Sequence, residues 1–460
     1  MRGRCPSRGV CCPPCRPQWL RSERVLLPHG LAPAAVAIAD GRIRTVADAA
    51  PPGAPVDDLG DDVLLPALTD THVHLNEPGR TAWEGFDTGT RAAAAGGVTR
   101  LVDMPLNCIP VTTTAEALRR KRQAAEGQLW VDVSTWGGVI PGNDAELREM
   151  VALGALGFKA FLCPSGIDEF PASTADDLRR AMPILRDLGV PLLVHAELEG
   201  PLRDPAPSED PRAYARYLHS RPKEWEDRAV ALVAALVAET GCRAHIVHLS
   251  SDGALAVVRE AHARGLPLTA ETCPHYLGLA AEDVPDGDTA YKCAPPIRER
   301  DNREALWQAL QDGTLAFVVT DHSPCLPALK RLDTGDFGEA WGGIASLQLG
   351  LRSVWTEAHR RGLPLERVVG WMAEGPARWL GLADRGAVRP GAVADLVRFR
   401  PDPVAPLDPA TLLHRHPTTP WAGRPLRGEV AATWLRGEPV WADGRIVGQA
   451  RGRFVGGEGA

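Results

Sequence analysis

The sequence predicts an α/β protein: a (β/α)8 barrel of the TIM type with a small composite β-sandwich formed by both chain ends. Short apolar runs alternate with amphipathic helical stretches eight times in the middle of the chain, which is typical of a closed parallel barrel. Both ends consist instead of short strands separated by turns, and the two ends of a chain often lie close together. A length of 460 residues suits one large barrel with a small companion domain.

The first segment, residues 1–21, has no periodic pattern and is expected to be a disordered or mis-started leader. Four of the ten cysteines crowd this segment, but they lack a second ligand pair at the spacing of a zinc finger. The other six are scattered singly, which favours a reducing, cytoplasmic setting over a disulfide framework. The leader cysteines are Cys5, Cys11, Cys12 and Cys15.

The composite β-sandwich is expected over residues 22–64 and 386–460. Its apolar runs are interrupted by hairpin signals at Asp40-Gly41, Arg436-Gly437 and Asp443-Gly444. The two segments are predicted to close together into one domain, because chain termini usually lie near each other on the surface of a domain.

The barrel is expected over residues 65–385, with helices between its strands. Several of these helices end in glycine, a C-cap signal. The eight expected strands lie at residues 67–75, 98–105, 130–139, 157–163, 190–197, 243–250, 266–273 and 316–323.

Polar residues stand at the carboxyl ends of five of these strands, which in a barrel converge on the catalytic face. A single histidine there is more often a hydrogen-bonded core residue than a ligand. The joint pattern of four histidines, a lysine and an aspartate has no such structural explanation, and imidazole and carboxylate are ligands of zinc-type ions. The predicted metal ligands are His72, His74, Lys159, His195, His248 and Asp321.

Lys159 is the unusual member, because an ammonium has no lone pair with which to bind a metal. A deprotonated amine reacts with CO₂ to give a carbamate, whose two oxygens suffice to bridge two cations. The lysine therefore indicates a centre with two divalent metal ions.

Seven segments of the chain together carry a family resemblance: "HLNEPGR", "KAFLCPSGIDEF", "VDMPLNCIPVTT", "ETCPHYL", "KCAPPIR", "TDHSPC" and "WGGIASLQ". They resemble segments of the amidohydrolase superfamily, in its cyclic-amidase branch and within that the allantoinases. The resemblance covers about residues 22 to 450 and is most specific in the first two segments.

The resemblance implies a binuclear centre, with zinc as the expected metal. His72, His74 and Asp321 would hold one ion, and His195 and His248 the other. Lys159, modified to N6-carboxylysine, would bridge them together with a hydroxide. The resemblance also implies a homotetramer.

Allantoinases open the ring of allantoin to give allantoate in purine degradation, and the predicted site suits that reaction. Two cations lower the pKa of a bridging water towards neutrality. Asp321 is the expected catalytic residue, which would accept the proton of the nucleophile and pass it to the departing ring nitrogen.

The identity of residue 76, an asparagine, is the main evidence for a neutral substrate such as allantoin. Dihydroorotases usually carry an arginine at this place, two residues after the second histidine, to bind a carboxylate. An uncharged amide fits neutral allantoin, and an extended chain would turn Asn76 to the same side as His74. The remaining expected substrate contacts are Asn107 and the backbone around Cys293, Ala294, Gly342 and Gly343. Trp341 is a candidate wall of the pocket, Glu77 and Arg80 are expected to order the first loop, and His275 and His322 to support the site.

Two alternatives remain open from the sequence. One is another cyclic-amide hydrolase, of the hydantoinase, dihydropyrimidinase or dihydroorotase type. The other is a non-catalytic barrel that acts as a scaffold. The net charge of −7 argues against a nucleic-acid partner, and the absence of a run of about 18 apolar residues argues against a membrane span.

Overall fold

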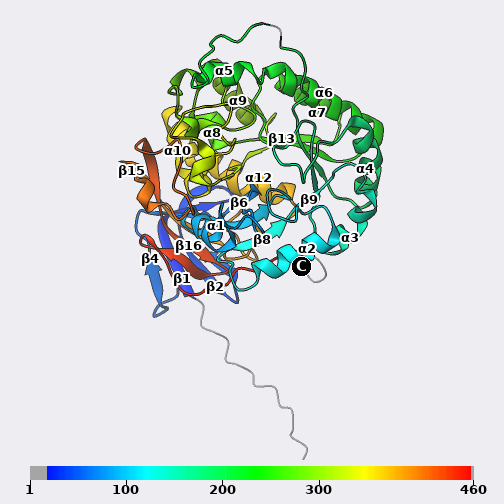
Figure 1. Ribbon diagram of the computed structural model, residues 1–460. Coiled ribbons are helices and arrows are strands. Elements are labelled where there is room, and N and C mark those ends of the chain that lie inside the picture. Colours follow the sequence, from blue (N-terminus) through cyan, green and yellow to red (C-terminus); the bar gives the residue numbers. More distant parts are fainter. Residues whose placement is uncertain (1–17, 203, 457–460) are drawn as a thin grey trace, which may run out of the picture.

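The computed structural model describes residues 18–202 and 204–456, which form a barrel with a β-sheet beside it (Figure 1). The leader cysteines lie outside the described residues. Strand β1 (Gln18–Leu27) already begins at Gln18, so residues 18–21 belong to the sheet and not, as the sequence predicts, to the leader. Trp19 and Leu20 of this segment are buried, and all four residues pair with the second strand, which ties the segment to the sheet.

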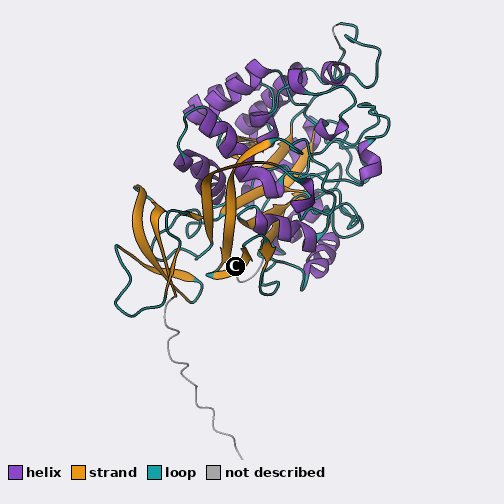
Figure 2. Ribbon diagram, turned by 90° about the vertical axis from the view of Figure 1, so that its left-hand side faces the viewer, coloured by secondary structure: helices purple, strands orange, loops and turns teal. Residues whose placement is uncertain are grey.

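Both chain ends contribute to one nine-stranded sheet in the order β18-β17-β16-β15-β5-β1-β2-β3, with β4 beside β1. The two ends meet where β5 pairs antiparallel with β15, Leu65 opposite Val397. Figure 2 shows these strands lying to one side of the helices. The bounds are β1 as above, β2 Gly30–Ala39, β3 Arg42–Ala47, β4 Val56–Asp58, β5 Val63–Pro66, β15 Leu396–Pro406, β16 Pro425–Leu435, β17 Glu438–Ala442 and β18 Arg445–Ile446.

The three hairpin signals that the sequence predicts are two-residue turns between paired strands. Both residues of each turn have positive φ, as at Asp40 (52°) and Gly41 (73°), which is the backbone of a type I′ turn. The sheet encloses an apolar core of its own, to which Leu20, Val36 and Leu396 contribute from three different strands. The composite β domain is therefore built from both ends of the chain.

Each barrel strand lies inside the apolar run from which it is predicted. The third strand is interrupted at Trp136 and continues as β9, and it links a three-stranded and a six-stranded parallel sheet. A bridge between Val73 and His322 joins the first strand to the segment after the last. The strands are β6 Leu68–Val73, β7 Val98–Asp103, β8 Asp132–Thr135, β9 Gly137–Gly138, β10 Phe158–Phe161, β11 Leu192–His195, β12 Ala244–Ile246, β13 Leu268–Thr272 and β14 Phe317–Val318.

Helices surround the barrel, and several of them begin or end at recognisable caps. Thr174 caps α4 in a capping box with Asp177, and glycines with positive φ end α6 (Gly241) and α9 (Gly313). The helices are α1 Phe86–Ala95, α2 Ala115–Ala125, α3 Leu147–Ala152, α4 Ala175–Asp187, α5 Tyr214–His219, α6 Lys223–Thr240, α7 Ala254–Ala263, α8 Pro274–Gly278, α9 Arg300–Asp312, α10 Gly350–Arg360, α11 Leu365–Val369 and α12 Gly375–Trp379. Among the described residues, no helix is long and apolar enough to cross a membrane.

Candidate metal centre and substrate pocket

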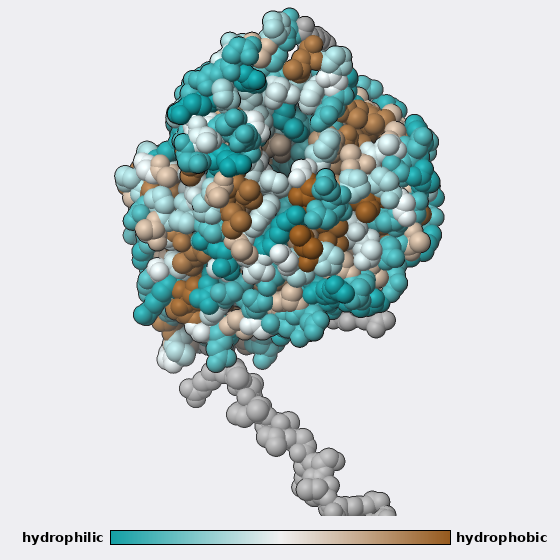
Figure 3. Space-filling model, in the orientation of Figure 1, coloured by the Kyte–Doolittle hydropathy of each residue, from teal (hydrophilic) through white to brown (hydrophobic). Residues whose placement is uncertain are grey.

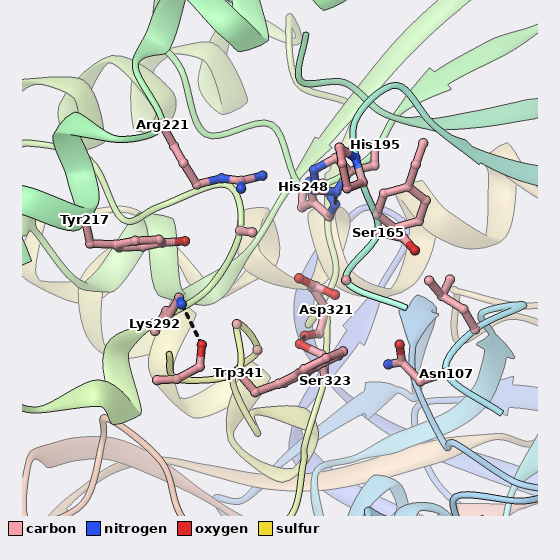
Figure 4. A pocket seen from close by; sticks show the side chains of 18 of the residues that line it. Asn107, Ser165, His195, Tyr217, Arg221, His248, Lys292, Asp321, Ser323 and Trp341 are labelled. Atoms are coloured by element: carbon pink, nitrogen blue, oxygen red, sulfur yellow. Dashed lines mark hydrogen bonds between the residues drawn. The ribbon is translucent and has the colours of Figure 1, made fainter. Parts of the chain in front are cut away.

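The six predicted ligands come from five strands and meet at the carboxyl ends of the barrel strands. His72 lies in β6 and His74 follows it, Lys159 lies in β10, and His195 is the last residue of β11. His248 and Asp321 follow β12 and β14 within three residues. All six are buried. Figure 3 shows the surface hollowed over the upper part of the barrel, and Figure 4 shows His195, His248 and Asp321 around the cavity inside.

One group of donors is centred on Asp321. Its Oδ1 lies 3.2 Å from Nε2 of His72 and 3.6 Å from Nε2 of His74. Nζ of Lys159 lies 3.2 Å from the same His72 nitrogen. One donor atom from each of His72, His74 and Asp321 falls within 4.8 Å of the others, which is close enough to hold one ion.

A second group is the pair His195 and His248, whose Nδ1 and Nε2 atoms face each other at 3.0 Å. Phe161 stacks on the His195 ring with centroids 4.6 Å apart and planes inclined by 16°. Lys159 is two residues before Phe161 on β10, and the rings of His72 and His248 are 5.2 Å apart. Strand β10 therefore contacts both groups, through Lys159 at His72 and through Phe161 at His195.

The outer nitrogens of three histidines are engaged by acceptors. His72 Nδ1 lies 2.6 Å from Glu271 and His74 Nδ1 lies 2.7 Å from the carbonyl oxygen of Leu106. His195 Nε2 lies 2.7 Å from Glu197. An acceptor at the outer nitrogen places the ring proton there and directs the lone pair of the inner nitrogen towards the cluster, as in metal-binding histidines. This donor set fits divalent cations of the zinc type.

Burial keeps these groups in the form that binds metal. It lowers the pKa of His72 and of His248 well below the usual value, so both rings are neutral at pH 7. Burial also lowers the pKa of Lys159 to about 8, although the nearby Asp321 and Glu271 oppose the shift. A larger fraction of this amine than of an exposed lysine is therefore unprotonated near neutral pH and able to react with CO₂.

Glu197 and Glu271 are functional residues that the sequence analysis missed. Burial alone would raise the pKa of Glu197, but Arg221 and His195 outweigh it and hold that pKa at about 2. Arg221 contacts Glu197 at 2.5 Å and lines the cavity. Alternation along an extended strand was the available signal, since Glu197 stands two residues after His195.

Cys163 lies near enough to His195 and Glu197 to form another possible cation site. Two observations argue against it. Burial raises the pKa of the Cys163 thiol to about 12, so the thiol stays protonated. Glu197 is already neutralised by Arg221. The pair of His195 with His248 is the better second site.

The cavity above the histidines has a volume of about 570 Å³. Trp341 forms part of its wall, as the sequence predicts. Of the six expected substrate contacts, four line it (Asn107, Ala294, Gly342 and Gly343) and two do not (Asn76 and Cys293).

Asn76 lies behind Asn107 because its backbone is left-handed, with φ of 62°, and not extended. Its amide donates to the carbonyl oxygen of Pro324 at 3.3 Å, and its own carbonyl oxygen accepts from Asn107 at 3.5 Å. The Cys293 side chain turns away to the carbonyl oxygen of Pro295.

The supporting residues that the sequence indicates are found near the site. Glu77 accepts a hydrogen bond from the Phe86 N–H, and Arg80 donates to the carbonyl oxygen of Asn107 at 2.7 Å, so both order the first loop. His322 contacts Glu84 at 3.2 Å. His275 is buried, and neither ring nitrogen has a partner in the described part of the chain.

Comparisons with known proteins agree with this geometry. The model of the amidohydrolase family matches residues 63–440. The chain is 52% identical to an allantoinase of Streptomyces avermitilis, over 95% of this chain and 98% of that one. It is 41% identical to an allantoinase of Arabidopsis thaliana, over 94% and 90% of the two chains.

Solved structures give the same fold. An L-hydantoinase (dihydropyrimidinase) from Arthrobacter aurescens superimposes with a TM-score of 0.90 at 28% identity, over 95% of this chain and 99% of that one. A dihydropyrimidinase from Brevibacillus agri superimposes with a TM-score of 0.86 at 27% identity, over 95% and 98%.

Proposed function

We propose that this chain, which belongs to the amidohydrolase family, opens the ring of allantoin by hydrolysis to give allantoate. The observation that carries the proposal is the convergence of His72, His74, His195, His248, Lys159 and Asp321 at one end of the barrel, with the outer histidine nitrogens engaged by acceptors. The substrate is supported by relatives named allantoinase at 38–52% identity over most of the chain.

We propose two divalent ions, with zinc as the native metal. His72, His74 and Asp321 would hold one ion, His195 and His248 the second, and Lys159 as N6-carboxylysine would bridge them. The lowered pKa of Lys159 supports this modification, because only the neutral amine reacts with CO₂. When bound, the ions supply Lewis acidity, which polarises the scissile carbonyl and lowers the pKa of water.

Asp321 moves the proton in this proposal. Its carboxylate lies beside His72 and lines the cavity, so it can reach both the attacking water and the ring nitrogen that leaves. An amide nitrogen leaves poorly unless it is protonated, so proton delivery matters as much as proton removal. Trp341 and Asn107 line the cavity in which an uncharged ring would sit.

Hydantoin is the second candidate substrate, because the similar solved structures are hydantoinases and dihydropyrimidinases. Their identity to this chain, at 25–28%, is well below that of the allantoinases. Hydantoin lacks the ureido group of allantoin, and we expect it to be the poorer substrate.

A hydrolysis panel tests the proposal. The purified protein, with its metal content measured, is assayed on allantoin, hydantoin, dihydrouracil and dihydroorotate. We expect the highest kcat/KM on allantoin. A higher kcat/KM on any of the other three would contradict the substrate, and turnover of none by a metal-loaded protein would favour the scaffold alternative.

Assembly and location complete the proposal. A homotetramer is expected from the resemblance to cyclic amidases, and light scattering on the purified protein measures it. A cytoplasmic location is supported by six described cysteines that are all free. Fractionation of the source cells tests that location.

A further inference from the structure

Lys330 is a buried lysine that faces backbone carbonyl groups. Its Nζ lies 3.0 Å from the carbonyl oxygen of Lys292, 3.2 Å from that of Trp341 and 3.5 Å from that of Thr289. The residue is 4% exposed, and no carboxylate in the described chain forms an ion pair with it. Burying an ammonium costs free energy, and burial lowers the pKa of Lys330 accordingly. The three carbonyl oxygens compensate part of this cost by accepting hydrogen bonds from the ammonium.

The carbonyl groups belong to the two loops expected to contact substrate, 289–294 and 338–343. In a trans peptide the C=O and the following N–H point in opposite directions. The Trp341 carbonyl points to Lys330, so the N–H of Gly342 points away from Lys330. Gly342 lines the cavity whereas Lys330 does not, and the Gly342 N–H has no partner in the described residues. The ammonium therefore directs a free donor towards the cavity.

Further contacts leave these loops little freedom. The Gly343 N–H donates to the carbonyl oxygen of Lys292 at 2.9 Å. The Nζ atom of Lys292 in turn donates to the carbonyl oxygen of Ala340 at 2.5 Å, and Figure 4 marks a hydrogen bond of Lys292 with a dashed line. A Cβ added at Gly343 would lie 2.2 Å from the carbonyl oxygen of Ser323. The Trp341–Gly342 peptide is thus held from both sides, and its N–H does not need to be ordered when a ligand enters.

We propose that Lys330 is a positioning residue that fixes the Trp341–Gly342 peptide, so that the Gly342 N–H donates to the ring carbonyl that is not attacked. The inference rests on the proposed function. Ring opening of a cyclic ureide turns one ring carbonyl into a carboxylate and leaves the other in a ureido group. The second carbonyl needs a donor away from Asp321. The positive charge of the Lys330 ammonium, next to the Trp341 carbonyl oxygen, polarises the peptide group and strengthens the Gly342 N–H as a hydrogen-bond donor.

The first experiment uses the parent protein and two competitive inhibitors of allantoin hydrolysis. Hydantoin and 2-thiohydantoin differ only in the atom at this second carbonyl, and sulfur accepts hydrogen bonds poorly. We expect hydantoin to bind about fivefold to tenfold more tightly, which is the worth of one hydrogen bond. Equal inhibition by the two compounds would overturn the assignment of the Gly342 donor without any variant.

The second experiment replaces Lys330 with Met and with Gln. Lys330→Met should raise KM about fivefold to tenfold with little change in kcat, and bring the two inhibition constants together. Lys330→Gln retains hydrogen-bond donors and should recover part of the difference. The control is Lys121→Met, which removes another fully buried ammonium, bonded to Asp103 at 2.6 Å, and tests for general destabilisation.

The outcomes separate the two proposals. If the parent does not hydrolyse allantoin, the proposed function fails. If it does, but folded Lys330→Met keeps the parent's KM and inhibitor preference, the positioning role fails. An equal loss of preference in Lys121→Met would also overturn it, because the effect would then follow stability and not the loop.

Discussion

The pocket has two regions that are built by different means. Its floor is the cluster of six candidate ligands at the strand ends, which offer side-chain atoms and of which all but His72 line the cavity: His72, His74, Lys159, His195, His248 and Asp321. One wall, called the wall below, is formed by the loops 289–294 and 338–343, which present backbone groups. The floor depends on which residues are present, whereas the wall depends on how the backbone is held.

One buried lysine lies in the floor and another lies against the wall, and the two lysines have different neighbours. Lys159 lies 3.2 Å from a histidine nitrogen, and burial lowers its pKa to about 8, which favours a reactive amine. Lys330 lies among carbonyl oxygens, which accept hydrogen bonds from a charged ammonium. Burial lowers the pKa of both lysines. They differ in their partners, because carbonyl oxygens surround Lys330 whereas a histidine nitrogen faces Lys159.

The largest effect should come from Lys159→Ala, which tests the floor. Loss of the bridging group should remove most bound metal and lower kcat about a thousandfold or more, since metal catalysis contributes several kcal/mol. Short-chain carboxylic acids should partly restore activity, because a carboxylate can also bridge two cations. Assays with and without acetate, beside metal analysis, measure both. Full activity without added acid would show that the lysine is structural.

The next largest effect should come from the glutamates behind the histidines. Glu271→Gln and Glu197→Gln should each weaken metal binding about 10- to 100-fold, because a neutral amide holds the ring less firmly. Titration of the metal-free protein with zinc measures this affinity. The control is Glu84→Gln, which alters the partner of His322, a histidine outside the floor. Equal weakening in the control would contradict a specific role for the two glutamates.

Two neighbouring glycines test the wall. Gly343→Ala should raise KM about tenfold at unchanged metal content, because the new Cβ would lie 2.2 Å from the carbonyl oxygen of Ser323 and the loop must shift. Gly342→Ala should change KM by less than about threefold, since its Cβ would meet Ala294 at an ordinary 3.7 Å. Steady-state kinetics on both variants checks this, and equal KM values would argue against a rigid wall.

The smallest expected effects are those of replacing Asn107 and Asn76, which should differ in whether KM or stability changes. Asn107→Ala should raise KM about fivefold, the value of one hydrogen bond, because Asn107 lines the cavity. Asn76→Ala should leave KM nearly unchanged and lower the stability by about 1 kcal/mol, because alanine disfavours the left-handed backbone there. Kinetics and denaturant unfolding separate the two. A larger KM effect from Asn76 would restore it as a substrate contact.

The floor could be predicted from the sequence because its chemistry is carried by residue types that are rare at strand ends. The barrel strands could be predicted equally well, since each lies in a separate apolar run of the sequence. The position of Asn76 outside the cavity could not be predicted, because a left-handed φ reverses the side on which its amide lies. Lys330 ends a short 3-10 helix, Pro327–Lys330, and nothing in its local sequence pattern indicates that it meets three carbonyl groups.

The pairing of β5 with β15 has a consequence for the order in which the protein is made. Leu65 and Val397 lie side by side, yet the ribosome completes the second strand only after the whole barrel has been synthesised. Until then β5 lacks one neighbour, and its unpaired edge is open to other chains. Domains generally fold as units as the chain emerges, with the amino-terminal part first. In this protein β5 must wait for β15 before its second edge is paired, so solubility during synthesis depends on how the nascent chain protects that edge.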